Sequence, residues 1–221
     1  MKNLARLAGR PLMDYCVRAA KAANSVSRIL CSTDSEEIGA HCESLGIEVM
    51  WRPAEMAEDS TPTTDVVKHF AKTVADSEAG VPELVALLQP TSPFVLPEQI
   101  DACMGILTSA PDAASVQTVL RSPHHSHAYN QRIIENGYVR FRFSEERRAA
   151  HNKQAKPVHF MLGNFIGFRL QDALEQESSF PEPSLSIEIA QAHALDADGP
   201  WDFQLGEAML AAGLVKLPHL D

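Results

Sequence analysis

Short apolar runs alternate with segments of helical periodicity through the first half of the chain. The apolar runs fall at 28–32, 47–51, 84–88 and 114–119, and the run at 84–88 carries no charge. Strands that alternate with helices predict βαβ units and an α/β fold with a mainly parallel sheet, covered on both faces. Because ligands bind such sheets where the strands end, residues that directly follow a strand are the candidate site residues.

The pattern changes after residue 120. Asn136 and Gly137 separate two apolar, β-branched runs, which is a strong hairpin signal. A charged stretch at 144–156 and a further strand at 160–170 follow, and a strand at 185–189 and a helix at 201–212 end the chain. We therefore expect one domain over residues 1–221, in which 120–170 form an inserted, small antiparallel lobe.

Composition and charge narrow the function. The net charge of −10 gives no basic excess for binding a nucleic-acid polymer, although a small anionic ligand stays possible. No apolar run has the length of a membrane span, so we expect no membrane association. The four cysteines form no CxxC pair and predict reduced thiols in a cytoplasmic protein. The basic amino-terminal segment could suggest a transit peptide, but its helical spacing favours a place in the fold.

Two acidic residues are the first candidate for chemistry. Asp196 and Asp198 flank Ala197 at the end of a predicted strand, so alternation places both carboxylates on one face. Two close carboxylates repel unless a cation lies between them, and Mg²⁺ takes such oxygen ligands together with phosphate. The alternative is a turn rich in Asp, in which Asp198 caps the following helix.

Two further loops follow predicted strands. The segment 89–93, Gln-Pro-Thr-Ser-Pro, offers an amide and two hydroxyls that could recognise a base or a sugar, or it is a proline-rich turn. Arg52 could bind a phosphate or carboxylate with two hydrogen bonds, or form a surface salt bridge. The segment 33–35 is more typical of a helix cap than of a site. His124, His125 and His127 invite a zinc hypothesis, which the lack of nearby Cys or acidic partners disfavours.

Taken together, these segments resemble the acylneuraminate cytidylyltransferases, the CMP-sialic acid synthetase family. The matching pieces occur in the family's order: Lys2-Asn3-Leu4, Gly9-Arg10-Pro11-Leu12, residues 32–38, residues 52–59, residues 87–93, and Asp196-Ala197-Asp198 with Asp202 beyond it. The Gln-Pro-Thr-Ser-Pro piece is closer to the sialic and legionaminic acid branch than to the branch that uses shorter sugars.

The resemblance implies a Rossmann-like three-layer α/β/α nucleotidyltransferase fold. It also implies an enzyme that joins CTP to a nine-carbon α-keto sugar acid, giving the CMP-sugar and pyrophosphate with Mg²⁺ or Mn²⁺ as cofactor. By carry-over, Asp196 and Asp198 would hold the metal and serve catalysis. The residues carried over to the substrates are Lys2, Asn3, Arg52 and Thr63 for the nucleotide, and Gln89, Thr91, Ser92 and Lys153 for the sugar. Family members are typically homodimers, so residues 138–157 are the expected interface.

The chain also departs from the family's pattern. The family has a strand and a glycine-rich phosphate loop directly before its Lys-Asn, whereas here Met1 precedes Lys2 and Asn3. Its Leu-Arg after the Ser-Pro is Phe94-Val95. One alternative is therefore a truncated, catalytically impaired or inactive homologue. Another is a glycosyltransferase that uses the DxD for a nucleotide sugar, which the short segment after Asp198 disfavours.

Overall fold

Four strands form the central sheet, in the order β10-β6-β9-β5. Their bounds are β5 (Leu84–Leu87), β6 (Ser115–Arg121), β9 (Phe160–Arg169) and β10 (Ser184–Glu188). β10 pairs in parallel with β6, whereas β9 is antiparallel to both β6 and β5. β5, β6 and β10 thus run in one direction and β9 alone in the other, so the predicted α/β fold is confirmed with a sheet that is mixed.

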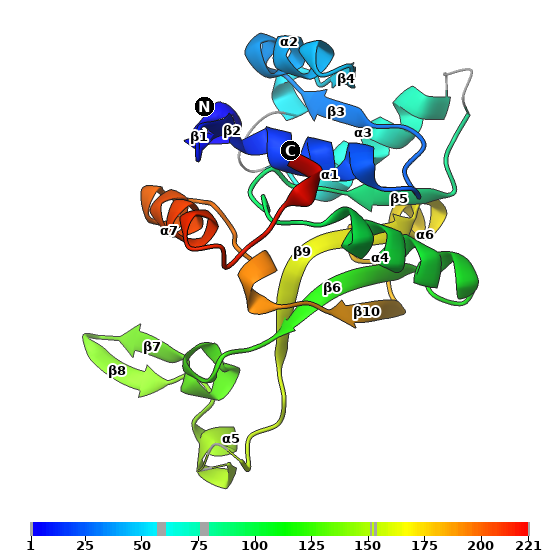
Figure 1. The fold of residues 1–221 in the computed structure, drawn as a ribbon. Helices are drawn as coiled ribbons and strands as arrows, with labels where there is room; N and C mark the ends of the chain where they lie inside the picture. The colour runs from blue at the N-terminus through cyan, green and yellow to red at the C-terminus, as the bar shows by residue number, and fades with distance from the viewer. Residues whose placement is uncertain (1, 57–60, 76–79, 151, 153, 221) are drawn as a thin grey trace.

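A second parallel pair lies apart from this sheet. It consists of β3 (Leu30–Thr33) and β4 (Glu48–Trp51), which are joined by α2 (Glu36–Ser44). The computed structural model describes residues 2–56, 61–75, 80–150, 152 and 154–220. Figure 1 shows the β3–β4 pair above β5, with α1 (Leu12–Ala22) and α3 (Thr63–Ala75) beside the space between them.

Helices cover both faces of the sheet, as the uncharged strand at 84–88 predicts. On one face, α1 and α4 (Pro97–Ser109) pack their buried side chains against β6 and β9. On the other face, α3 and α6 (Leu170–Glu175) pack against β5 and β9. Phe94 and Val95, which lead into α4, are both fully buried, so the position where the family has an arginine is a core position here.

The termini and the late helix form a third cluster. β1 (Arg6–Leu7) and β2 (Arg10–Pro11) make a short antiparallel pair, and α7 (Pro200–Ala211) lies near them. Here Leu7 and Phe94 pack with Leu195 and Ala197. The amino-terminal segment is therefore part of the fold, as its helical spacing predicts.

The lobe after β6 hangs away from the sheet (Figure 1). It contains the hairpin β7 (Arg132–Glu135) and β8 (Tyr138–Phe141), followed by α5 (Ser144–Ala149). Asn136 and Gly137 have φ angles of 51° and 81°, so the two-residue turn adopts the left-handed conformation that this pair of residues favours. β9 starts at the lobe, pairing Phe160 with Arg121, and ends inside the central sheet.

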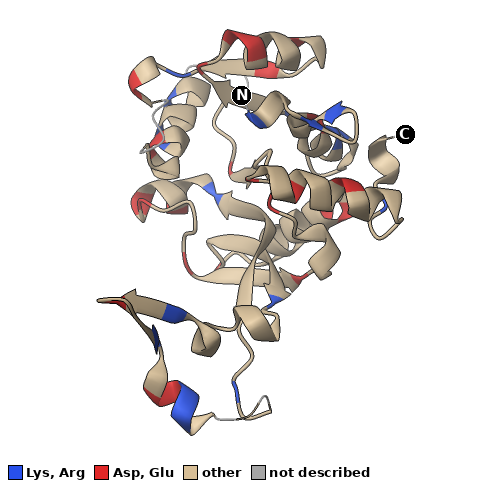
Figure 2. Cartoon of the chain, turned by 90° about the vertical axis from the view of Figure 1, so that its left-hand side faces the viewer, with Lys and Arg blue, Asp and Glu red and all other residues tan. Residues whose placement is uncertain are grey.

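Other sequence-based expectations can be checked on the fold. Among the described residues no helix is long and apolar enough to cross a membrane. Cys16, Cys31, Cys42 and Cys103 are free cysteines, and only Cys31 is not buried. Acidic and basic positions are interspersed over the helices of the body (Figure 2).

Candidate functional site

Polar side chains gather at one end of a cavity between β3 and β5. The cavity has a volume of about 1170 Å³, comparable with or larger than typical small-molecule sites. Its polar lining includes Asn3, Ser32, Asp34, Arg52 and Thr63. Three of the four residues carried over to the nucleotide thus line one space, although they come from the amino terminus, the loop after β4 and the start of α3.

Arg52 is held at this cavity by its own backbone. Its N–H donates to the carbonyl of Thr33 at 2.9 Å, which extends the β3–β4 pairing by one step. Its Nη2 lies 3.5 Å from a carboxylate oxygen of Asp34, a long contact for a salt bridge. Its Nε is buried and makes no hydrogen bond with any described residue. Because a buried charged donor without a partner is costly, this N–H is a candidate ligand contact.

Ser32 offers a second unsatisfied group in the same cavity. Its hydroxyl oxygen is buried and has no hydrogen-bond partner in the described part of the chain. By its position alone, at the start of the matching piece 32–38, Ser32 does not differ from the ordinary polar end of a strand. Burial together with the missing partner is what identifies it.

The neighbouring loop at 33–35 forms a helix cap, as its sequence favours. The side chain of Ser35 accepts a hydrogen bond from Ile38 N and caps α2. Thr33 is buried, and its hydroxyl accepts from the N–H of Ser35 at 3.1 Å. This loop therefore contributes helix capping, and Asp34 faces Arg52.

The Asp196-Ala197-Asp198 segment has the alternation expected from its sequence. Ala197 is fully buried, and both aspartates are exposed. The segment is not the end of a strand, however, because β10 stops at Glu188. It is an extended stretch fixed by one backbone hydrogen bond, from Ala197 N to the carbonyl of Thr91 at 2.7 Å.

Asp198 does not cap α7, so that alternative is wrong. Gly199 occupies the N-cap, and the carboxylate of Asp202 accepts from the N–H groups of Asp198 and Gly199 at 3.0 and 2.7 Å. The side chain of Asp198 instead forms an ion pair with Lys2. The side chain of Asp196 makes no hydrogen bond or ion pair with any residue that the structure describes.

The Gln-Pro-Thr-Ser-Pro loop lies beside this acidic segment. The side chain of Gln89 is exposed, whereas Ser92 is buried and donates its N–H to the Gln89 carbonyl at 3.0 Å. Thr91 supplies the carbonyl that holds Ala197. The structure therefore brings this loop and the acidic pair together, and it leaves Gln89 and Thr91 more accessible than Ser92.

The buried side-chain amide of Asn164 links the segments that flank the 89–93 loop and the acidic pair. The amide nitrogen of Asn164 on β9 donates to Gln99 Oε1 at 3.0 Å and to the carbonyl of His193 at 2.9 Å. Its amide oxygen accepts from Thr118 on β6 at 3.0 Å. His193 contacts the Phe94 carbonyl at 3.1 Å through Nδ1. This network connects the segment before Asp196 with the segment after Pro93, and sequence reasoning missed its role.

Two other expectations concern residues away from this edge. Lys153 lies outside the described residues. In the histidine-rich loop, both ring nitrogens of His127 are engaged: Nε2 contacts the Pro157 carbonyl at 2.9 Å and Nδ1 accepts from Tyr129 N at 3.1 Å. The ring also stacks on His159 with centroids 4.2 Å apart. Both ring nitrogens of His127 are thus engaged in contacts within the protein. Among the described residues, no cluster of three or more His, Cys, Asp or Glu side chains is suited to hold a metal.

The carboxylates of Asp196 and Asp198 can be compared with the ligands that Mg²⁺ prefers. Mg²⁺ is commonly bound by one or two carboxylates together with substrate phosphates and waters, not by a complete protein cage. The exposed pair Asp196 and Asp198 has the donor atoms for that mode. A metal would meet Lys2 already in contact with Asp198.

The fold, with its candidate site on loops that follow β3, β4 and β5, is that of a Rossmann-like α/β/α nucleotidyltransferase domain. A solved structure, CMP:2-keto-3-deoxy-manno-octonic acid synthetase complexed with CTP, has a similar fold, with a TM-score of 0.66 at 14% identity, covering 96% of this chain and 92% of its own. The chain belongs to the cytidylyltransferase family, whose model matches residues 1–135.

Two relatives extend the similarity beyond those residues. The N-acylneuraminate cytidylyltransferase of Escherichia coli is 28% identical over 206 residues, which is 92% of this chain but 47% of that protein. The chain thus spans about half the length of that relative. The CMP-N,N'-diacetyllegionaminic acid synthase of Legionella pneumophila is 26% identical over 217 residues, covering 95% of this chain and 89% of that protein.

Proposed function

We propose that the chain is a CTP-dependent cytidylyltransferase that activates a nonulosonic α-keto sugar acid. The anomeric hydroxyl would attack the α-phosphorus of CTP, forming the new O–P bond while the bond to pyrophosphate breaks and the hydroxyl proton leaves. The observation that carries the proposal is the polar end of the cavity, where the unpaired Arg52 Nε and Ser32 hydroxyl lie with Asn3 and Thr63. The relatives named for sialic and legionaminic acids support the sugar class.

The chain's own residues would divide the task. Arg52 and Ser32 donate hydrogen bonds into the nucleotide space, and Asn3 and Thr63 add polar groups at its rim. Gln89 and Thr91 present an amide and a hydroxyl to the sugar, beside the carboxylates. Phosphoryl transfer depends mainly on positioning and charge stabilisation. Mg²⁺ or Mn²⁺ bound by Asp196 and Asp198 would supply neutralisation of the phosphate charge.

The direct test is CTP-dependent release of pyrophosphate by the 221-residue chain. The sugars to compare are N-acetylneuraminate, a legionaminate and 3-deoxy-manno-octulosonate, each with and without Mg²⁺. Release that requires CTP, the metal and a nine-carbon acid supports the proposal. Release only with the eight-carbon acid would assign the sugar to another branch. No release with any sugar, together with no rise in melting temperature at millimolar CTP, would favour the inactive homologue.

Arg52 allows a sharper test with a matched control. Loss of a hydrogen bond from a charged group costs about 1.5–3 kcal/mol, or roughly 10- to 150-fold in affinity. We therefore expect Arg52→Gln to weaken CTP binding by about that factor. Arg18 on α1 also has a buried, unpaired Nε but does not line the cavity. Equal loss of CTP affinity in Arg52→Gln and Arg18→Gln would show that the effect is not local to the cavity.

The acidic pair has its own test. Asp198→Asn removes one exposed ion pair, which is worth up to about 1 kcal/mol, so thermal stability should change little. Mg²⁺-dependent CMP-sugar formation should be lost. A large fall in stability with unchanged turnover would show that Asp198 is structural.

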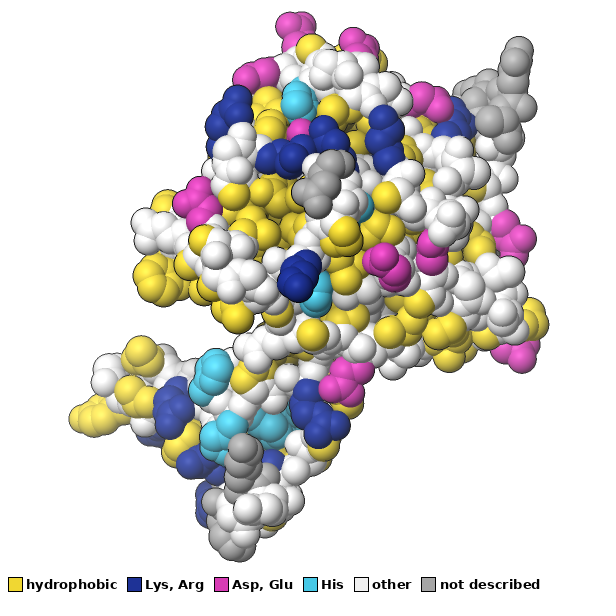
Figure 3. Space-filling view, viewed as in Figure 1, with side chains coloured by type: hydrophobic (Ala, Val, Ile, Leu, Met, Phe, Trp, Pro, Cys, Tyr) yellow, Lys and Arg dark blue, Asp and Glu magenta, His cyan; other side chains and the backbone are white. Residues whose placement is uncertain are grey.

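A homodimer formed through the lobe is also proposed. Ile134, Tyr138 and Val139 at the hairpin are 74, 71 and 64% exposed, and Phe160 and its two successors on β9 are about half exposed. Figure 3 shows apolar side chains at the tip of the lobe, below the body. Clustered apolar surface of this kind favours association.

Sedimentation velocity with Val139→Glu tests the dimer. This charge on the hairpin should shift the protein toward the monomer. Val81→Glu, at an apolar position that is 56% exposed and lies outside the lobe, should leave the association unchanged. A wild-type monomer at tens of micromolar would contradict the proposal.

A further inference from the structure

The lobe is strongly basic, although the chain as a whole is acidic. Residues 121–160 contain eight Lys and Arg against three Glu and no Asp, whereas the whole chain contains 19 basic and 29 acidic residues. Figure 3 shows Lys, Arg and His side chains gathered on the lobe, below the body. Positive charge concentrated on one part of a molecule raises the local concentration of anions there.

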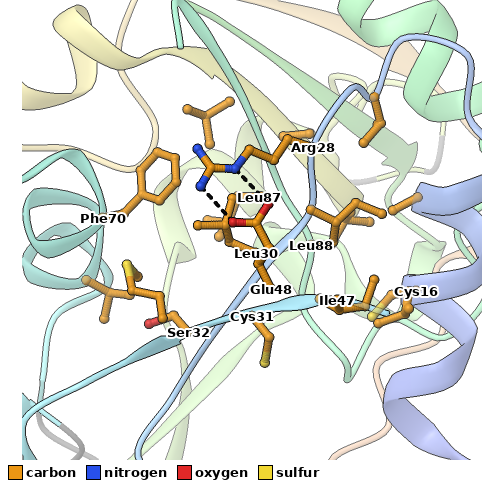
Figure 4. A pocket seen from close by; sticks show the side chains of 18 of the residues that line it. Cys16, Arg28, Leu30, Cys31, Ser32, Ile47, Glu48, Phe70, Leu87 and Leu88 are labelled. Atoms are coloured by element: carbon orange, nitrogen blue, oxygen red, sulfur yellow. Dashed lines mark hydrogen bonds and ion pairs between the residues drawn. The ribbon is translucent and has the colours of Figure 1, made fainter. Parts of the chain in front are cut away.

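The cations of the body and those of the lobe differ in their partners. In the body, Arg28 and Glu48 form an ion pair at 2.7 Å, which Figure 4 shows, and Lys68 and Glu177 form another at 2.5 Å. In the lobe, three cations form no ion pair with any residue that the structure describes, although neighbouring arginines do. These three are Arg132, Arg147 and Lys156.

The three cations converge on one neutral residue, Asn130. Arg147 Nη1 and Lys156 Nζ donate to its side-chain oxygen at 2.5 and 2.7 Å, and Arg132 Nη1 donates to its backbone carbonyl at 2.5 Å. The amide nitrogen of Asn130 donates to the carbonyl of His124, which directs the amide oxygen toward the cations. Loss of hydration lowers the pKa of Lys156, and the charge of Arg147 lowers it further. An amide oxygen cannot neutralise like charges that lie this close together.

Aromatic rings hold this cluster in place. Both guanidinium groups lie over the ring of Phe141 on β8, with the Cζ of Arg132 and of Arg147 at 4.6 and 4.1 Å from its centroid. Below them, Tyr129 packs edge-on against His127, with ring centroids 5.0 Å apart. Donor groups that are fixed before a ligand arrives lose less conformational entropy when they bind it.

The cations keep further donors for a ligand. Each of them uses one nitrogen on Asn130, whereas a guanidinium carries five N–H groups and an ammonium three. A carboxylate carries one negative charge, but a phosphate monoester carries about −1.5 to −2 at pH 7 and has three strong acceptor oxygens. The arginine fork also matches phosphate with two parallel hydrogen bonds. A phosphate group therefore suits three converging cations better than a carboxylate does.

We propose that Arg132, Arg147 and Lys156 form a phosphate-binding site in the lobe, separate from the candidate nucleotide site. None of the three lines the cavity between β3 and β5. A bound phosphate group, free or carried by a metabolite, would supply the negative charge that the cluster lacks. It would also join β7, α5 and the segment before β9 through one ligand. A ligand that bridges three elements stabilises them against local opening.

Amide hydrogen exchange locates this binding on the whole chain. The protein is titrated with inorganic phosphate, and separately with pyrophosphate and with acetate, at constant ionic strength. Exchange is followed on peptides covering 130–135 and 144–149, with β6 (115–121) as the reference. At ten times the half-saturating phosphate concentration, exchange in the two lobe peptides should slow about tenfold, with the reference unchanged. Protection by pyrophosphate alone would support the site and assign it to a diphosphate.

Two double variants separate the cluster from the general charge of the lobe. Arg147→Gln with Lys156→Gln removes two members, so we expect the affinity for phosphate to fall tenfold or more. Arg140→Gln with Arg148→Gln removes the same charge from exposed cations of the same lobe, and the affinity should stay within about threefold. Equal losses in the two variants would show diffuse attraction and would overturn the proposal.

Asn130→Asp tests the cluster in the opposite sense. This change keeps the shape of the side chain and places a full negative charge against Arg147 and Lys156. The melting temperature should be kept or raised, because the new ion pairs offset the lost hydrogen bond to His124. Protection by phosphate should disappear, because the cations are already compensated.

Three results would overturn the proposal. They are full phosphate protection in Asn130→Asp, no protection of the original lobe peptides at tens of millimolar phosphate and pyrophosphate, and equal protection by acetate. None of these measurements uses CTP or a sugar, so their outcome is independent of the proposed activity.

Discussion

Asn164→Ala tests the buried amide that connects the two site loops. Asn164 is 4% exposed, and its side chain takes part in three hydrogen bonds, with Gln99, His193 and Thr118. Removing it leaves the Gln99 oxygen and the His193 carbonyl each short of one donor. Thr118 still has an acceptor in the Phe165 carbonyl at 3.3 Å. With about 1 kcal/mol for each lost bond, the free energy of unfolding should fall by about 2–3 kcal/mol.

Urea denaturation measures this change directly. The midpoint should fall while the slope stays constant, because the mutation does not alter the surface exposed on unfolding. The melting temperature of a chain of this size should fall by roughly 5–10 °C. Asn152 is an exposed match whose side chain accepts one hydrogen bond from Ala155 N, and Asn152→Ala should change stability by less than about 0.5 kcal/mol. A loss for Asn164→Ala as small as that of the control would refute the network's importance.

Three further perturbations test other parts of the fold and site. Gly206→Ala would place a methyl group 2.9 Å from the Leu195 side chain. Although alanine favours a helix more than glycine does, we expect thermal melts to show that the free energy of unfolding falls by about 1–2 kcal/mol. A gain in stability would show that α7 and the segment carrying Leu195 move apart without cost. Burial opposes the ionisation of Asp101, but hydrogen bonds from the loop after α1 outweigh it and lower its pKa to about 2. The stability that wild type gains over Asp101→Asn should therefore be present above about pH 4 and disappear as pH falls toward 2 in urea melts; a gap that is constant with pH would contradict this. Lys2→Met should tighten Mn²⁺ binding at Asp198 up to about fivefold by electron paramagnetic resonance, because the lysine no longer competes; unchanged affinity would show that the metal does not use this carboxylate.

Features that depend on neighbouring residues could be predicted from the sequence. The hairpin is an example, since only Asn136 and Gly137 need to adopt positive φ. The covered strand at 84–87 is another, because its lack of charge requires helices on both faces. The alternation at Asp196 and Asp198 also followed from local spacing, and buried Ala197 confirms it.

Features that depend on distant partners could not be predicted in this way. Asp198 and Asp202 are equally plausible caps by residue type, and only the geometry shows that Asp202 takes that role. The pairing of Lys2 with Asp198 joins the two ends of the chain, which no local pattern records. The unpaired Nε of Arg52 is still harder to predict, because it requires knowing that the group is buried and that no described residue accepts its hydrogen bond.

One short segment physically connects the three parts of the site. Lys2 pairs with Asp198, whereas its neighbour Asn3 lines the cavity, and both lie in a single turn of 3-10 helix at Lys2–Leu4. Ala197, next to Asp198, is in turn hydrogen-bonded to Thr91 in the loop at 89–93. The cavity and the acidic pair thus both contact this turn, through the adjacent residues Asn3 and Lys2, so a substitution that displaces the turn should affect both places together.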